Sequence, residues 1–494
     1  MLRRRSSSVA LATVAAVVAT AGAGTAVDPA PASAAMPSTS GIGSRSGVMV
    51  RDLRTGEVLM SRNGNTRRIP ASVTKVFTVA AALRELGPDW RPQTRVVATG
   101  ALSGTSWKGD VYLVGGGDPT LSRTGLATLA ASAARALGAK RLSGRLYADA
   151  TTFDSWQGGH RTRKRVDHDM GGRLGALTSD RGSGESDTAR RTLSVFRSAL
   201  RGRGLTVTGA LASRRAPAGA TPVAALAGPP VATLASSVLG PSDNFQAETL
   251  LKDLSSRDGV DGACRHDAGL PATPGTPVPA PAPTDPVPTP VTPPPANVDD
   301  GADGGAAPSG GATTPTGGTA TTAAGTTGTA TADTATPTVP GDRAADCAAQ
   351  GAAARASSTS RGISVLRRSI RGLIGSTPKL SDGSGLTRSN RVSPAQVTRL
   401  LVRANDDETL GPILRSALPQ AGRTGTLAGR MRGTAAVGRC QAKTGTINGV
   451  SALAGYCRTR SGRDVAFAIL QNGGNTSSAR RFQDRFVARL AKAG

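Results

Sequence analysis

A serine and a lysine three residues apart, Ser72 and Lys75, open an apolar stretch that runs to Leu83. The stretch is Ala-rich and stops before Gly87-Pro88, which predicts a buried helix. Residues three apart are neighbours on one helix face, and a serine at the helix N-terminus lies beside free N–H groups. A serine needs a base to become a nucleophile, and a buried lysine can serve if its pKa falls from about 10.4 toward neutrality.

The spacing alone is weak evidence, because this composition yields a second Ser-x-x-Lys, Ser376 to Lys379. That one contains a proline and no helical run follows it, so we expect a loop. Lysine itself is informative, because only eight of the 60 basic residues are Lys. Arginine cannot be deprotonated in proteins and is a poor base. Lys75 and Lys443 therefore stand in motifs where the chain would by default use Arg.

A second candidate segment, Ser242-Asp243-Asn244, separates two expected helices, 231–239 and 245–254. It exposes a hydroxyl and an amide at a helix–helix corner. Taken alone, such a segment is more often a helix N-cap.

A third candidate, Lys443-Thr444-Gly445-Thr446, lies on the first strand of an expected hairpin. A lysine there can bind a carboxylate, and the glycine lets another backbone approach closely. The alternative is an ordinary edge-strand lysine. The same pattern recurs with Arg at 423–426, which shows how readily it arises.

Four cysteines without a Cys-x-x-Cys spacing favour disulfides over a metal site. The Asn-Gly pair at 448–449 is a strong signal for a two-residue hairpin. A turn centred there makes Cys440 and Cys457 direct cross-strand partners, within reach of a disulfide. By elimination, Cys264 would pair with Cys347 and clamp the ends of the low-complexity stretch between them.

The N-terminus has the three parts of a signal peptide: Arg3–Arg5, an apolar run over Val9–Ala23 and an Ala-x-Ala site ending at Ala34. We expect residues 1–34 to be removed, with Gly24–Ala26 as an alternative site. The apolar run falls short of the about 20 residues of a membrane span, and no comparable run follows. The sequence thus predicts a secreted, extracytoplasmic protein without a transmembrane segment after cleavage.

The 494 residues carry a net charge of +27, which points to an anionic partner such as nucleic acid, a membrane surface or a wall polymer. Aromatics make up only 3%, which disfavours a nucleic-acid binder that stacks bases. Residues 268–342 are nearly all Pro, Thr, Ala, Gly and Asp. Such a stretch lacks the apolar side chains that offset ordering entropy, so we expect it to be disordered.

In the rest of the sequence, expected strands and helices do not alternate regularly as in a βαβα fold, which indicates the α+β class. We expect a hairpin from 48–52 and 57–60, and a C-terminal amphipathic helix over 477–493. Between about 96 and 229 we expect short strands with one helix around 126–137.

With Ser-x-x-Lys, Ser-x-Asn and Lys-Thr-Gly in this order, the sequence resembles the active-site serine penicillin-recognising enzymes. The interval from Ser72 to Ser242 is long. In this the sequence more specifically resembles the penicillin-binding D-alanyl-D-alanine carboxypeptidase/endopeptidase family, whose members carry a domain inserted between the first two motifs. Further stretches that resemble the family are 113–121, 380–390, 418–422 and 425–427. The resemblance covers about 45–265 and 355–492; the smaller inserted domain and the 268–342 stretch depart from it.

The resemblance implies a β-lactamase/transpeptidase-like domain, an antiparallel sheet flanked by helices, built from 36–98 and 233–494. Residues 99–232 would form the smaller, β-rich inserted domain. Ser72 would attack the D-Ala-D-Ala carbonyl with Lys75 as general base, and Ser242 would relay the proton to the leaving amine. Water would then release the acyl-enzyme.

The resemblance also implies the substrate contacts. Asn244 would hold the substrate amide, and the Lys443–Gly445 motif would bind the terminal carboxylate through Lys443 and Thr444. The backbone N–H groups of Ser72 and Thr446 would form the oxyanion hole. No metal or other cofactor is needed, and a Ser-His-Asp triad is disfavoured because all three histidines lie outside the motifs: His160, His168 and His266.

The expected partners are peptidoglycan peptides as substrates, β-lactams as inhibitors and, by charge, anionic cell-wall polymers. A serine β-lactamase of the same fold is one alternative, although it would lack the long insertion. A non-catalytic cell-wall-binding protein is another, although the intact Ser72, Lys75 and Lys443 argue against it.

Overall fold

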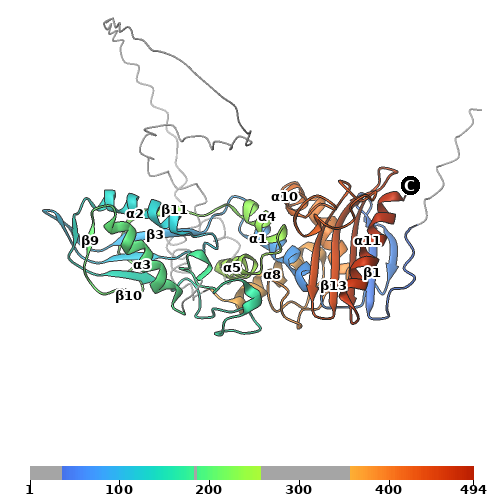
Figure 1. The fold of residues 1–494 in the computed structure, drawn as a ribbon, viewed down its shortest axis with the longest axis horizontal. Helices are drawn as coiled ribbons and strands as arrows, with labels where there is room; N and C mark the ends of the chain where they lie inside the picture. The colour runs from blue at the N-terminus through green and yellow to red at the C-terminus, as the bar shows by residue number, and fades with distance from the viewer. Residues whose placement is uncertain (1–35, 183–185, 258–356, 494) are drawn as a thin grey trace, which may run out of the picture. The chain divides into compact units, whose positions relative to one another are not determined.

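The computed structural model describes residues 36–182, 186–257 and 357–493 (Figure 1). The expected signal peptide, the stretch 268–342 and the Cys264–Cys347 pair lie outside the described residues. Within those three ranges, no helix is long and apolar enough to cross a membrane.

The larger sheet has five antiparallel strands in the order β12-β13-β14-β1-β2 (Figure 1). The predicted N-terminal hairpin is confirmed as β1 paired with β2. β1 also pairs with β14, so strands from both ends of the chain share one sheet. The strands are β1 (Ser46–Asp52), β2 (Val58–Arg62), β12 (Cys440–Ile447), β13 (Val450–Arg458) and β14 (Asp464–Asn472).

The hairpin of β12 and β13 turns at residues 448–449, and its register is the predicted one. Cys440 lies directly opposite Cys457 and Ile447 opposite Val450. The two cysteines form a disulfide, with a Cα–Cα distance of 4.0 Å. This confirms one of the two predicted cysteine pairs.

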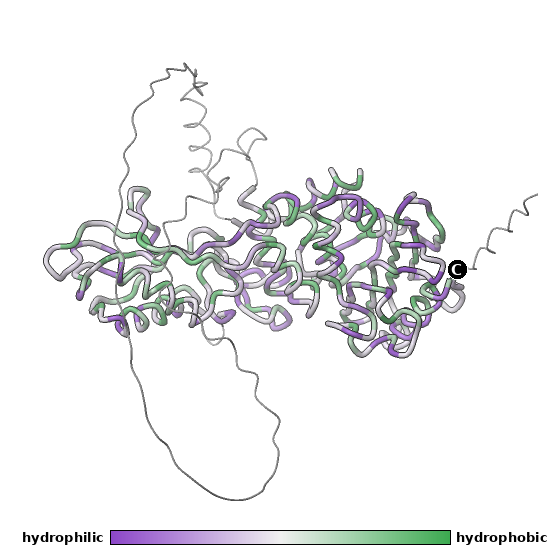
Figure 2. Tube along the Cα trace, turned by 90° about the horizontal axis from the view of Figure 1, so that it is seen from above, coloured by the Kyte–Doolittle hydropathy of each residue, from purple (hydrophilic) through white to green (hydrophobic). Residues whose placement is uncertain are grey.

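Both faces of the larger sheet are covered, because alternate residues of β14 enter different hydrophobic clusters. Residues 465, 467 and 469 pack with Phe482, Phe486 and Leu490 of the C-terminal helix α11 (Thr476–Lys492). Residues 466, 468 and 470 pack with the helices of the other face. Figure 2 shows hydrophobic and hydrophilic residues interspersed along the described part of the trace. The predicted C-terminal amphipathic helix is thus confirmed.

The helices of the other face carry most of the larger hydrophobic core. The expected helix 231–239 has its predicted bounds, and the segment 376–379 lies outside any helix, as predicted. The helices are α1 (Thr74–Glu85), α4 (Val231–Leu239), α5 (Asn244–Leu254), α8 (Thr359–Ile374), α9 (Pro394–Asn405) and α10 (Leu410–Ala417).

A second five-stranded sheet lies in the long interval between the first two motifs, in the order β10-β8-β6-β3-β11. A small sheet, β4-β5-β7-β9, accompanies it. The strands of these two sheets are β3 (Gln93–Ala98), β4 (Ala101–Ser103), β5 (Ser106–Lys108), β6 (Val111–Val114), β7 (Arg141–Leu142), β8 (Leu146–Asp149), β9 (Thr206–Val207), β10 (Ala212–Ser213) and β11 (Thr221–Ala227).

Two features of this region differ from expectation. Besides the predicted helix, α2 (Arg123–Leu137), it contains α3 (Thr188–Arg201), whose apolar face buries Leu193, Phe196 and Leu200. The helical spacing of these three residues was the signal for α3. The strand β3 pairs with β6 and β11, so it lies with the inserted elements although 36–98 was assigned to the other domain. The boundary between the two domains depends on which strands pair with β3, and local sequence does not show this pairing.

The Cys440–Cys457 bond should stabilise the fold chiefly by restricting the unfolded chain, because it closes a 17-residue separation. We expect the double variant Cys440→Ser/Cys457→Ser to lose about 3 kcal/mol in the free energy of unfolding. Urea denaturation of the two proteins measures the difference. An unchanged free energy of unfolding would contradict this account.

Candidate active site

Ser72 lies in a 3-10 turn, Ala71–Val73, that leads directly into α1. Ala71, the residue before it, has a φ of +47°, which is a strained conformation for a residue with a Cβ. The Ser72 side chain is partly exposed, whereas the helix that follows is buried from Thr74 to Leu83. The turn therefore presents a hydroxyl to solvent at the edge of the core.

Lys75, in the first turn of α1, is fully buried and meets three oxygen atoms. Its Nζ lies 3.0 Å from Ser72 Oγ, 2.6 Å from Asn244 Oδ1 and 2.7 Å from the Ser384 carbonyl oxygen. The structure thus brings the first two predicted motifs together around one amine. Ser384 is a third participant that the motifs did not indicate.

Two of these three oxygens can only accept a hydrogen bond. The Ser384 carbonyl has no proton, and Asn244 turns its Oδ1 toward Lys75 because its Nδ2 donates to the Asp169 carbonyl at 2.6 Å. A neutral amine has two N–H bonds and one lone pair. As an ammonium, Lys75 donates to all three oxygens. Once it is neutral and donates to the two carbonyls, its lone pair is left for the Ser72 hydroxyl, the one partner that can donate.

Burial lowers the pKa of Lys75 to about 8, because the low-dielectric surroundings penalise the ammonium. The carboxylates of Asp382, Glu248 and Asp243 act in the opposite direction. Burial outweighs them, so a substantial fraction of Lys75 is neutral near pH 8. The arrangement can therefore abstract a proton from Ser72.

The second motif lies at the corner between α4 and α5, as predicted. Asp243 is the N-cap of α5, its side chain accepting from Gln246 N at 2.9 Å, and it also pairs with Arg181. Ser242 has a φ of +68° and is partly exposed. No side-chain hydrogen bond of Ser242 is formed within the described part of the chain. Its hydroxyl is therefore not committed to a described neighbour.

Lys443, on β12, is a second fully buried lysine, and its Nζ donates to the Thr444 carbonyl at 2.9 Å. Burial, with the charge of Lys75 second, holds the pKa of Lys443 well below its ordinary value. The Thr444 hydroxyl lies partly exposed beside the Thr426 hydroxyl, 2.8 Å away. A bound anion beside these groups would favour the charged form of Lys443.

Glycine at position 445 brings the third motif against the first. A Cβ at this position would lie 2.7 Å from the Pro70 carbonyl oxygen and 3.0 Å from Ser72 N, too close for any other residue without movement. The next residue, Thr446, is exposed, and its hydroxyl accepts from Arg480 at 3.1 Å. Strand β12 and the Ser72 turn are therefore in direct backbone contact.

Several residues at the site were not singled out from the sequence. Asp169 and Ser384 each supply a carbonyl oxygen, a role that any residue type can fill, so no sequence signal existed for them. Glu248 had a usable signal, because it follows Asn244 by four residues on α5 and thus shares its face.

The remaining candidates lie apart from this constellation. Ser376 accepts a hydrogen bond from Gln396 in a loop, and Lys379 makes an isolated bridge with Arg391. No hydrogen bond joins His160 or His168 to Ser72 in the described part of the chain, and His266 lies outside it. No cluster able to hold a metal ion is present among the residues that the structure describes.

Comparisons with known proteins agree with this geometry. Residues 34–171, 178–270 and 345–493 match the D-Ala-D-Ala carboxypeptidase 3 (S13) family. The chain is 31% identical over 486 residues to a D-alanyl-D-alanine carboxypeptidase of an Actinomadura species, an alignment covering 91% of this chain and 82% of that protein.

Solved structures show the same fold at lower identity. Penicillin binding protein 4 (dacB) of Haemophilus influenzae superposes with a TM-score of 0.62 at 18% identity, covering 91% of this chain and 96% of that one. Its complex with a novel β-lactam superposes with a TM-score of 0.57, also at 18% identity, covering 90% and 94%. The predicted α+β fold is thereby confirmed. Because the family match spans most of the sequence, the chain belongs to the D-Ala-D-Ala carboxypeptidase 3 family, the assignment that its three motifs predicted.

Proposed function

We propose that this protein is a serine-type carboxypeptidase that hydrolyses the terminal D-Ala-D-Ala bond of peptidoglycan stem peptides through an acyl-enzyme on Ser72. One observation carries the proposal: Lys75 Nζ lies 3.0 Å from Ser72 Oγ and has carbonyl acceptors for two N–H bonds, so the neutral amine can accept the Ser72 proton. Family membership supplies the substrate class. The motifs resemble a family of carboxypeptidases and endopeptidases, so cleavage of peptide cross-links would be a second reaction of the same site.

In the acylation step, Ser72 Oγ bonds to the carbonyl carbon of the penultimate D-alanine while its proton passes to Lys75 Nζ. The C–N bond to the terminal D-alanine then breaks. Ser242 lies on the segment next to Asn244 with its hydroxyl uncommitted to described neighbours, which suits it to relay the proton to the leaving amine. Water completes the cycle by hydrolysing the ester.

Substrate recognition falls to the partly exposed side of the site. Asn244 would hold the substrate amide, and Lys443 with Thr444 would bind the terminal carboxylate. A carboxylate next to buried Lys443 restores the charge that burial disfavours in the free enzyme. The backbone N–H groups of Ser72 and Thr446 would stabilise the oxyanion, and close packing at Gly445 supports this by joining the two segments.

Penicillin labelling tests the nucleophile. We expect a fluorescent penicillin to label the wild-type protein covalently and Ser72→Ala to remain unlabelled, because the ester cannot form. Ser376→Ala is the matched control: it removes the serine of the other Ser-x-x-Lys, and it should label normally. Equal labelling of Ser72→Ala, or loss of labelling in a folded Ser376→Ala, would show that the wrong serine was chosen. Rapid turnover of penicillin without a persistent adduct would favour the β-lactamase alternative.

The pH dependence of acylation tests the base. Lys75 abstracts a proton only when neutral, so the acylation rate should rise with pH around a midpoint near 8, the value to which burial lowers the pKa of Lys75. Below that midpoint the rate should fall roughly tenfold per pH unit. Lys75→Arg keeps a permanent charge and should abolish acylation. Stopped-flow measurement with a chromogenic β-lactam gives the profile, and a rate independent of pH from 6 to 9 would rule out this base.

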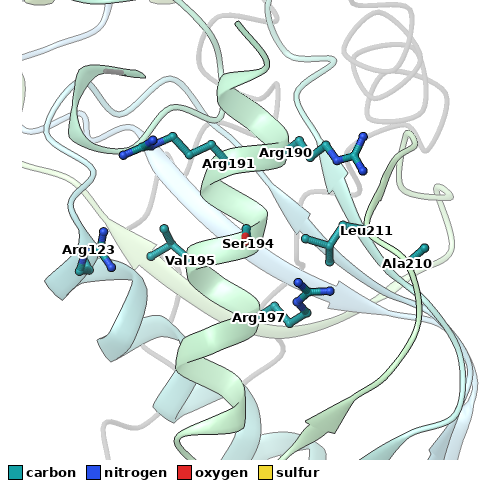
Figure 3. A pocket seen from close by; sticks show the side chains of 8 residues that line it. All are labelled: Arg123, Arg190, Arg191, Ser194, Val195, Arg197, Ala210 and Leu211. Carbon is teal, nitrogen blue, oxygen red and sulfur yellow. The ribbon is translucent and has the colours of Figure 1, made fainter. Parts of the chain in front are cut away.

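We also propose that the protein works outside the cytoplasm, next to anionic cell-wall polymers. The expected signal peptide and the Cys440–Cys457 bond suit an oxidising compartment. A hollow of about 530 Å³ beside α3 supports the choice of partner (Figure 3). Its lining residues include four arginines and no acidic side chain: Arg123, Arg190, Arg191, Ser194, Val195, Arg197, Ala210 and Leu211.

Binding of inorganic polyphosphate tests whether this arginine-lined hollow is an anion site. Guanidinium groups pair well with phosphate, so Arg190→Ser/Arg197→Ser should weaken binding at least threefold. The control Arg135→Ser/Arg460→Ser removes the same charge from exposed arginines outside the hollow and should weaken it less. Equal losses in a fluorescence titration would mean that diffuse charge, and not this hollow, binds the polymer.

A further inference from the structure

The turn 382–387, between α8 and α9, lies against Lys75 and carries the Ser384 carbonyl that accepts from its amine. A Cβ at Gly385 would lie 2.0 Å from the Ala71 carbonyl oxygen, so this turn packs directly on the residue before Ser72. Thr78 of α1 also donates to the Gly383 carbonyl at 2.7 Å. The position of the turn therefore decides where the lysine's third acceptor lies.

Two buried carboxylates hold the backbone N–H groups of this turn. The Glu248 Oε1 atom accepts from Gly383 N at 2.9 Å and from Ser384 N at 2.7 Å. Asp382 accepts from Gly385 N at 2.8 Å and from Thr387 N at 2.7 Å. Four backbone donors of the turn, at residues 383, 384, 385 and 387, are thus fixed by two buried side chains.

Glu248 and Asp382 differ in how completely they are bonded. Both oxygens of Asp382 accept backbone N–H bonds, and Asn390 Nδ2 adds a third hydrogen bond at 2.6 Å. Glu248 Oε2 is buried and has no partner among the described residues. Burial, with the charge of Asp382 second, raises the pKa of Glu248 to about 7. A buried carboxyl group with one unpartnered oxygen costs free energy of folding.

Glu248 lies close to the active-site groups, which suggests a functional reason for keeping a buried carboxyl group at this position. Glu248 lies one turn beyond Asn244 on the same face of α5, and Asn244 is the other carbonyl partner of Lys75. The helix therefore sets both acceptors, one directly and one through the turn. Besides each other, the charged groups that interact with Glu248 or Lys75 here are Asp382, Asp243, Lys252 and Lys443.

We infer that Glu248 is a positioning residue for acyl transfer: by holding the N–H groups of Gly383 and Ser384, it fixes the Ser384 carbonyl and thereby aims the Lys75 lone pair at Ser72. This role rests on the proposed function, in which Lys75 is the base. Glu248 forms no described hydrogen bond with Ser72 or Lys75, and its hydrogen bonds reach them through the turn. Its negative charge also favours the ammonium form of Lys75, as Asp382 does.

Two variants separate these contributions, with the rate of β-lactam acylation measured from pH 6 to 10. Glu248→Ala removes the anchor, so acylation should fall at least tenfold even at high pH, where Lys75 is neutral. Glu248→Gln keeps a carbonyl oxygen for the two N–H groups, so its acylation rate at pH 9 should lie within threefold of the wild-type rate. Because it removes a negative charge, its midpoint should move to lower pH.

The control is Asp253→Asn, which replaces another buried carboxyl of α5 that does not act on Lys75. It should leave both the rate and the midpoint at wild-type values. If Glu248→Ala does not fold, the rate of Glu248→Gln at pH 9 decides alone, and a loss of tenfold or more there overturns the inference, because the accepting oxygen is retained. A folded Glu248→Ala that acylates within threefold of wild type overturns it as well. These results are distinct from failure of the proposed function, in which wild type itself would not be acylated on Ser72.

Discussion

The burial of the Lys75 amine is the constraint on which the site depends. An ammonium with no access to solvent is unfavourable, so the amine needs either nearby negative charge or the neutral form. The structure places two carbonyl acceptors and one hydroxyl around it, and a neutral amine can use all three by donating to the carbonyls and accepting from the hydroxyl. Three segments must meet for this to happen: the Ser72 turn, the start of α5 and the turn before α9. The rest of the helical face packs so as to hold them together.

Close backbone contact is the second requirement, and it explains particular glycines. Gly445 lets β12 approach the Ser72 turn, and Gly385 lets the 382–387 turn approach the same Ser72 turn. Both contacts fall on the residues from Pro70 to Ser72, where Ala71 has a positive φ. The strained conformation is therefore held by neighbours on two sides. This rigidity keeps a hydroxyl, an amine and two carbonyl groups in one fixed geometry.

Much of this architecture follows from local sequence, and the part that does not has a clear physical origin. The Asn-Gly turn predicted the register of β12 and β13 because a two-residue hairpin fixes every later pair. The bounds of α4 followed from its apolar run and Gly240. The Ser384 carbonyl could not be predicted, because it is 309 residues from Lys75 and any residue type supplies the same atom. Helix α3 was missed although its spacing was present, since surrounding glycines suggested strands and turns.

The state of Lys75 can be measured directly, because the chain has only eight lysines. Lysine labelled with carbon-13 at Cε gives few enough resonances for each to be followed through a pH titration, and Lys75→Met identifies the one of interest. We expect this resonance to titrate with a pKa near 8, the value to which burial lowers the pKa of Lys75. A resonance that stays in the charged form up to pH 10 would contradict the claim that Lys75 is the base that activates Ser72.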